Sequence, residues 1–229
     1  MYWYWDSTIL ILIPALIIGL IAQAMVKSAY SKYSKVYNDR GMTGYDAARR
    51  ILDENGLFNV AIERVSGELT DHYDPQSNVI RLSDGVYNQT SVAAVGVAAH
   101  EAGHAVQYAQ GYFPIKIRSA IIPITQLGSS LAVPLVLIGL AFSSLDVLIT
   151  VGILLYCAVV LFQVITLPVE FDASSRAITI LRSSGYLSDK ELSGAKRVLT
   201  AAALTYVAAV ISSMLSLLRL LLLSNRRRR

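Results

Sequence analysis

The stretch TILILIPALIIGLIAQAMV, residues 8–26, is apolar at every position except Thr8 and Gln23. As a helix rising 1.5 Å per residue it would be about 28 Å long, close to the thickness of the hydrocarbon core of a bilayer. It is preceded by three aromatic residues of the kind that line membrane interfaces, Trp3, Tyr4 and Trp5. A cleaved signal peptide is disfavoured, because no basic residue precedes the apolar run. The sequence therefore predicts a first transmembrane segment over residues 1–26.

Three further apolar stretches follow later in the chain. Residues 119–142 and 147–167 are joined by a short polar turn, which predicts a transmembrane hairpin over residues 119–167. The last stretch, residues 198–223, carries Arg219 near its end, where a long side chain can reach the membrane interface. Of the 229 residues, 54% are hydrophobic and 16% are charged, an apolar excess over soluble proteins. We expect a mainly α-helical, polytopic membrane protein with a final membrane segment and basic tail over residues 198–229.

Residues 27–118 have the composition of a soluble segment, with ten basic and ten acidic side chains. Their patterns predict helices over residues 46–52 and from Thr90 or Ser91 to Gly111, and two short strands over residues 60–65 and 78–82. The net charge of +4 equals the four arginines at residues 226–229. Nucleic-acid binding would need basic side chains clustered on a folded face, so no nucleic-acid partner is expected.

The motif His100-Glu101-Ala102-Gly103-His104 lies within the second of these helices. Histidines four residues apart project from one helix face, about 6 Å from each other, and can reach one Zn²⁺ ion. Glu101 falls beside that face, where its carboxylate can take a proton from water and later pass one to the leaving amine. Small residues around the motif leave room for another stretch of backbone. The sequence predicts a catalytic zinc site with His100 and His104 as ligands and Glu101 as general base.

A third protein ligand has to come from outside the motif. Metzincins require Gly at position 107 and His at position 110, but this chain has Gln107 and Gln110, so that subclass is excluded. Glu170 is the best candidate, because it opens an amphipathic segment, residues 168–197, directly after a predicted span. The alternative for Glu170 is a charge at a helix end, stabilised by the helix dipole.

Four short runs resemble the bacterial membrane zinc metallopeptidases of YugP type, the neutral zinc metallopeptidases. They are LTDHYDP (69–75), VAAHEAGHA (97–105), LPVEFDAS (167–174) and AALTY (202–206). The resemblance implies an integral-membrane zinc protease with a gluzincin-like site on helices and a small β element in the soluble part. It also implies an edge strand that pairs with extended substrate. The strand at residues 78–82 is either this edge strand or a plain strand of the sheet.

More distantly, the layout is similar to HtpX-type and CAAX-type membrane proteases, whose third ligand is the Glu of an E-x-x-x-D pattern. Glu170 matches that Glu, but Ser174 stands where the Asp would be, with Asp172 displaced by two residues. Asp172 either orients a histidine ligand or faces solvent. His72 is interpreted as a surface residue rather than a distant ligand. Arg176 and Tyr206 are candidates for stabilising the oxyanion, but no sequence pattern assigns this role to either of them.

Basic residues flank the predicted spans on one side. They are Lys27, Lys32, Lys35 and Arg40 after the first, Lys116 and Arg118 before the second, and Arg176 and Arg182 after the third. By the positive-inside rule the catalytic segment is cytosolic. A full crossing by residues 198–223 would place the arginines at 226–229 outside, so re-entry or an interfacial position of that segment stays open.

These features together favour a zinc endopeptidase of the bacterial cytoplasmic membrane, acting on membrane or membrane-proximal polypeptides. The alternative is a catalytically silent membrane adaptor in which zinc fastens the structure. An intramembrane protease with zinc inside the bilayer is a further alternative, disfavoured because the motif helix adjoins a charged segment.

Overall fold

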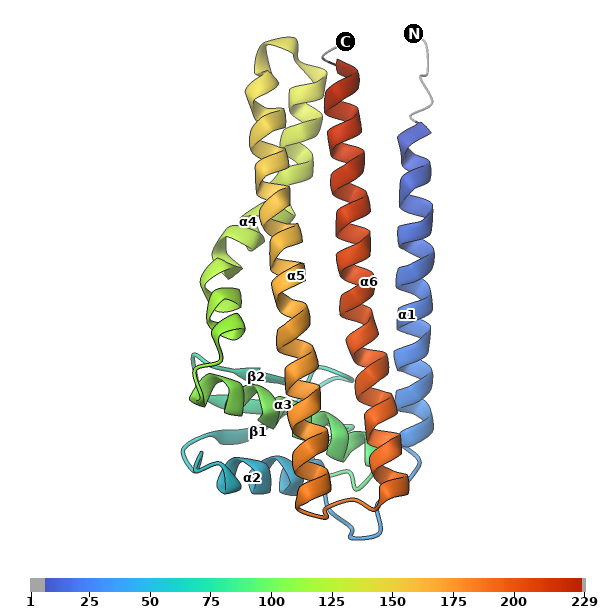
Figure 1. The fold of residues 1–229 in the computed structure, drawn as a ribbon, viewed down its shortest axis with the longest axis vertical. Coiled ribbons are helices and arrows are strands. Elements are labelled where there is room, and N and C mark those ends of the chain that lie inside the picture. Colours follow the sequence, from blue (N-terminus) through green and yellow to red (C-terminus); the bar gives the residue numbers. More distant parts are fainter. Residues whose placement is uncertain (1–6, 228–229) are drawn as a thin grey trace. The chain divides into compact units, whose positions relative to one another are not determined.

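The computed structural model describes residues 7–227, so the predicted aromatic belt at residues 3–5 lies outside the described residues. Figure 1 shows a predominantly helical chain. The helices are η1 (Ser7–Ile11), α1 (Leu12–Tyr33), α2 (Gly44–Glu54), α3 (Val92–Ala109), α4 (Phe113–Ala141), η2 (Ser143–Leu145), α5 (Asp146–Ser183) and α6 (Asp189–Arg227). Together with one small sheet, they confirm the predicted mainly α-helical fold class.

Four helical segments in the described chain are long and apolar enough to cross a membrane. They are Ser7–Tyr33, Phe113–Ala141, Asp146–Ser183 and Asp189–Asn225. By packing, the chain divides into two units. The first consists of Ile117–Leu167 and the described parts of Met1–Ala22 and Thr205–Arg229, and the second consists of Gln23–Lys116 and Pro168–Leu204.

The first unit contains the predicted hairpin, whose two arms, in α4 and α5, meet through small residues. A Cβ atom added to Gly152 of α5 would lie 2.6 Å from the carbonyl oxygen of Ala132, and one on Gly128 of α4 would lie 2.7 Å from that of Leu155. Glycine at these positions therefore lets the two backbones approach closely, as is common between membrane helices.

The second unit contains a three-stranded sheet in the order β1-β3-β2. Strand β1 (Ala61–Val65) pairs in parallel with β3 (Val79–Ser83), and β2 (His72–Asp74) pairs with β3 in antiparallel orientation, with Tyr73 opposite Ile80. Of the two alternatives left open for the strand at residues 78–82, the structure supports the plain sheet strand and contradicts the edge strand. Strand β3 is the central strand, with both of its edges paired and most of its side chains buried, and the sheet edges belong to β1 and β2.

Helix α3, which carries the zinc-binding motif, is fixed at both ends and packed on the sheet and α2. The Ser91 hydroxyl accepts a hydrogen bond from the Ala94 amide, which caps the helix as predicted. After the helix, Gly111 adopts φ +66°, a left-handed conformation that glycine favours at helix C-termini. Fully buried Ile51 and Ile80 belong to the same apolar core as α3, so the motif rests on a rigid support.

Candidate metal centre

The structure brings His100, His104 and Glu170 into one cluster, in which one ligand atom of each lies within 4.8 Å of the others. Glu170 Oε2 is 3.2 Å from His100 Nε2 and 3.5 Å from His104 Nε2. Glu170 is only 2% exposed, and His104 is 8% exposed. The three residues that the sequence nominated as ligands therefore meet in a shielded site, although a whole hairpin separates Glu170 from the motif helix.

The spacing fits a tetrahedral zinc ion. With ligand bonds of about 2.0 to 2.1 Å at tetrahedral angles, neighbouring ligand atoms lie ~3.3 Å apart. The two observed separations, 3.2 and 3.5 Å, bracket that value. A zinc ion held by three protein ligands would keep its fourth position for water or substrate, as in catalytic rather than structural zinc sites.

The electrostatics of the cluster also favour a cation. Burial by itself lowers the pKa of His104, but its hydrogen bond to Glu170 and the negative charges of Glu101 and Glu170 outweigh burial, so the pKa is raised. The surroundings of the His104 ring thus stabilise positive charge. A carboxylate and two imidazoles are a donor set that zinc accepts readily.

Gln107 fixes the tautomer of His104. Its Nε2 donates to two acceptors, the Val169 carbonyl at 2.8 Å and Asp172 Oδ2 at 2.7 Å, so its Oε1 has to be the atom that faces His104 Nδ1 at 3.0 Å. An amide oxygen only accepts, and Nδ1 therefore carries the proton. In the neutral ring of His104 the lone pair is then on Nε2, the nitrogen that faces Glu170 and would bind a metal ion, whereas in the protonated ring Nε2 donates a hydrogen bond to Glu170. Partners of this kind orient ligands in zinc proteins.

Ser174 is the corresponding partner of His100. Its Oγ lies 3.1 Å from His100 Nδ1, while Nε2 of the same ring faces Glu170. Ser174 thus contacts the first histidine from the position where the distantly similar proteases carry Asp. Asp172 reaches His104 only through Gln107 and also accepts a hydrogen bond from Arg176, so it neither contacts a histidine nor points freely into solvent.

Sequence reasoning missed Gln107 and Ser174 as partners of the histidines. The available signal was spacing: Gln107 is three residues after His104, and Ser174 is four residues after Glu170, so each shares a helix face with a predicted ligand.

Glu101 lies next to the cluster but outside the set of three. It is 8% exposed, and its Oε2 accepts a hydrogen bond of 2.9 Å from the backbone amide of Tyr73. Tyr73 is on the edge strand β2, and its ring contacts Tyr108 of α3 edge-on, at 5.5 Å between centroids. Strand β2 therefore holds the carboxylate of Glu101 in a defined orientation.

A close approach of two backbones puts Glu170 in reach of the motif. A Cβ added to Gly103 would lie 2.8 Å from the carbonyl oxygen of Ala173, which is inside normal contact distance. The predicted role of the small residues, to admit another stretch of backbone, is confirmed, and the backbone admitted is that of α5.

The other residues considered from sequence lie outside the cluster. His72 is exposed on β2, with Nδ1 2.8 Å from the Thr70 carbonyl. Arg176 binds Asp172 and Gln110 and lies over the ring of Tyr112. Among residues 7–227, no second group of three His, Cys, Asp or Glu side chains forms a comparable cluster.

Comparison with known proteins agrees with this geometry. A family model described as "Putative neutral zinc metallopeptidase" matches residues 8–225. The chain is 49% identical over 215 residues to the "Putative membrane protease YugP" of Bacillus subtilis (strain 168), covering 94% of this chain and 95% of that protein. No solved structure shows a significant match. The chain therefore belongs to the family described as "Putative neutral zinc metallopeptidase".

Proposed function

We propose that the chain is a membrane-bound, zinc-dependent endopeptidase in which His100, His104 and Glu170 hold the metal and Glu101 is the general base. The observation that carries the proposal is the cluster of His100, His104 and Glu170, in which Glu170 Oε2 lies 3.2 and 3.5 Å from the two histidine Nε2 atoms, as neighbouring ligands of one zinc ion would. The family membership agrees with it.

Each residue of the proposed site has a separate role in peptide hydrolysis. When bound, zinc supplies a Lewis acid that polarises the scissile carbonyl and makes water more acidic. The Tyr73 amide engages Oε2 of Glu101, which leaves Oε1 to take a proton from the attacking water. Glu101 then donates that proton to the leaving amide nitrogen, so its carboxylate is regenerated. Gln107 and Ser174 keep the two histidine rings in the orientation that presents Nε2.

The proposal places the site on the cytosolic side of a bacterial cytoplasmic membrane. The basic residues flanking the apolar stretches support this orientation. The cluster belongs to the packing unit that contains the sheet and most charges of residues 27–118, which argues against zinc within the bilayer. Substrates would be membrane or membrane-proximal polypeptides, because the site is tethered to membrane helices.

The competing function is a silent adaptor with structural zinc. Structural sites close the coordination sphere with four protein ligands. Here three ligands meet, and the nearby carboxylate of Glu101 is tied to β2 instead. This arrangement favours the enzyme.

The test compares wild type with Glu101→Gln, each purified in detergent and loaded with zinc. Glutamine keeps an oxygen that can accept the Tyr73 amide but loses the basic carboxylate, so zinc should stay while cleavage falls by several orders of magnitude. The probe is a peptide library prepared from total bacterial protein, and mass spectrometry counts the new termini. Exposed Glu68, changed to Gln, is the matched control and should cleave like wild type.

Each outcome decides between the two functions. New termini with wild type and with Glu68→Gln, but not with Glu101→Gln, support the endopeptidase. Cleavage by Glu101→Gln at the wild-type rate would show that Glu101 is not the general base. Zinc-loaded wild type that produces no new termini would favour the adaptor.

A further inference from the structure

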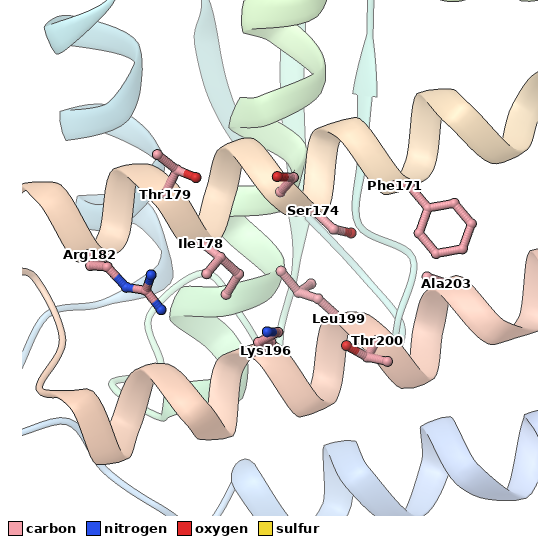
Figure 2. A pocket seen from close by; sticks show the side chains of 10 residues that line it. Phe171, Ser174, Ile178, Thr179, Arg182, Lys196, Leu199, Thr200 and Ala203 are labelled. Atoms are coloured by element: carbon pink, nitrogen blue, oxygen red, sulfur yellow. The ribbon is translucent and has the colours of Figure 1, made fainter.

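A pocket of about 340 Å³ lies between α5 and α6, apart from the side-chain cluster of the proposed metal site. Its lining comes from residues of the second unit, and Figure 2 shows the labelled side chains on the two helices. The volume falls within the range of small-molecule sites, about 300 to 1,000 Å³.

The pocket changes character along its length. Phe171 of α5 and Ala203 of α6 form one end, and Arg182 and Lys196 lie toward the other (Figure 2). Arg182 is three turns beyond Phe171, or about 16 Å along α5, and Lys196 is about 10 Å from Ala203 along α6. One end is therefore apolar and the other cationic.

Both helices belong to candidate membrane spans, Asp146–Ser183 and Asp189–Asn225, and along each helix the apolar end of the pocket is the end nearer to the longest apolar stretch. Upstream of Phe171, α5 contains the mainly apolar residues 147–167, and downstream of Ala203, α6 contains the mainly apolar residues 207–223, which include three serines and Arg219. A ligand that fits this polarity has an anionic head near Arg182 and Lys196 and an apolar tail near Phe171 and Ala203.

The two cations are available to a ligand. No ion pair joins Arg182 or Lys196 to an acidic group among the described side chains, and both are exposed to solvent. Hydroxyl groups of Ser175, Thr179 and Thr200 line the same pocket and can donate hydrogen bonds to ester or phosphate oxygens.

Neither Glu101 nor any of the three clustered side chains lines the pocket, which argues against a substrate peptide as its occupant. Ser174 lines the pocket and contacts Nδ1 of His100, whereas the metal-facing nitrogen of that ring is Nε2. The two ring nitrogens point in diverging directions, so the Ser174 hydroxyl stands between the pocket and the back of the ligand ring. A peptide held here would not present its scissile bond to Glu101.

We infer that this pocket binds an anionic phospholipid. Its phosphate pairs with Arg182 and Lys196, its glycerol region meets the hydroxyl groups, and an acyl chain runs past Leu199 toward Phe171. Basic pockets between membrane helices bind anionic headgroups on the same physical grounds. This inference does not depend on catalysis.

The test measures binding of dioleoyl-phosphatidylglycerol to the purified full-length chain in neutral detergent, by native mass spectrometry. The variant Arg182→Gln/Lys196→Gln removes both cations and should weaken binding about 30-fold, from about 1 kcal/mol per basic residue. The matched control Lys190→Gln/Arg197→Gln removes two exposed charges of α6 outside the pocket and should change binding less than about 3-fold. Thr200→Trp fills the pocket without changing its charge and should abolish binding.

Two comparisons identify the ligand. Zwitterionic dioleoyl-phosphatidylcholine should bind more weakly than phosphatidylglycerol, and water-soluble glycerol 3-phosphate at equal concentration should not displace the lipid, because it has no acyl chain. Displacement by glycerol 3-phosphate would assign the pocket to a free phosphate ester and overturn the lipid proposal. Undiminished binding in the folded double variant or in Thr200→Trp, or an equal loss in the control pair, would overturn it as well.

Discussion

Replacing Gln107 by Met tests whether the zinc affinity depends on the orientation of a histidine ligand. Methionine keeps the length and approximate volume of the side chain, but it cannot accept the His104 Nδ1 proton in the way an amide oxygen does. Gln107 is fully buried, so no solvent reaches the site to replace the lost 3.0 Å hydrogen bond. Loss of such a partner costs about 10 to 100-fold in metal affinity, or roughly 1.4 to 2.8 kcal/mol.

The assay is competition for zinc with a fluorescent chelator, on protein purified in detergent. Gln110→Met is the matched control, because Gln110 contacts Arg176 rather than a histidine and should leave zinc affinity unchanged. A zinc dissociation constant for folded Gln107→Met within about twofold of wild type, against the expected 10 to 100-fold, would refute the orienting role of Gln107.

Three other changes test neighbouring parts of the account. Gly103→Ala should lower both the melting temperature and the zinc occupancy, because the added Cβ would lie 2.8 Å from the Ala173 carbonyl oxygen. An unchanged melting temperature and zinc content would show that this close contact does not hold α5 against α3. Glu170→Ala should weaken zinc binding by more than about 100-fold, and Asp172→Ala should weaken it less, as measured by competition with a chelator. A larger loss of zinc affinity in Asp172→Ala than in Glu170→Ala would show that Glu170 is not the third ligand. A cysteine introduced at Asn55 should react with a membrane-impermeant maleimide only after the cells are opened. Labelling of this cysteine in intact cells would place residues 27–118 outside the cell, opposite to the proposed topology.

Much of the fold followed from local patterns that depend on few distant contacts. The apolar runs and the Ser91 cap depend only on residues that are close together in the sequence. The structure has long helices over the apolar runs and a helix that begins directly after Ser91. Glu170 could be nominated because a carboxylate following a hairpin returns to the side from which the hairpin started. These inferences needed only helix geometry and the length of a membrane span.

Other features depend on packing between distant segments. Strand β2 has only three residues, too few for an alternating pattern to emerge, and it exists because β3 offers it an edge. From the sequence, Gln107 served only to exclude the metzincin motif. Its role depends on Val169 and Asp172 of α5, which accept hydrogen bonds from its amide group. The apolar stretch ends at residue 167, yet the helix does not: α5 continues through Pro168 to Ser183.

The most direct test of the central claim is X-ray absorption at the zinc edge of the purified protein, combined with elemental analysis. We expect about one zinc per chain, with two imidazole nitrogens and oxygen ligands at about 2.0 to 2.1 Å and no sulfur. Glu101→Gln should give the same spectrum, because Glu101 lies outside the ligand set, whereas His104→Ala should lose one imidazole. A folded preparation without zinc, or a spectrum with a sulfur ligand at about 2.3 Å, would contradict the site built from His100, His104 and Glu170.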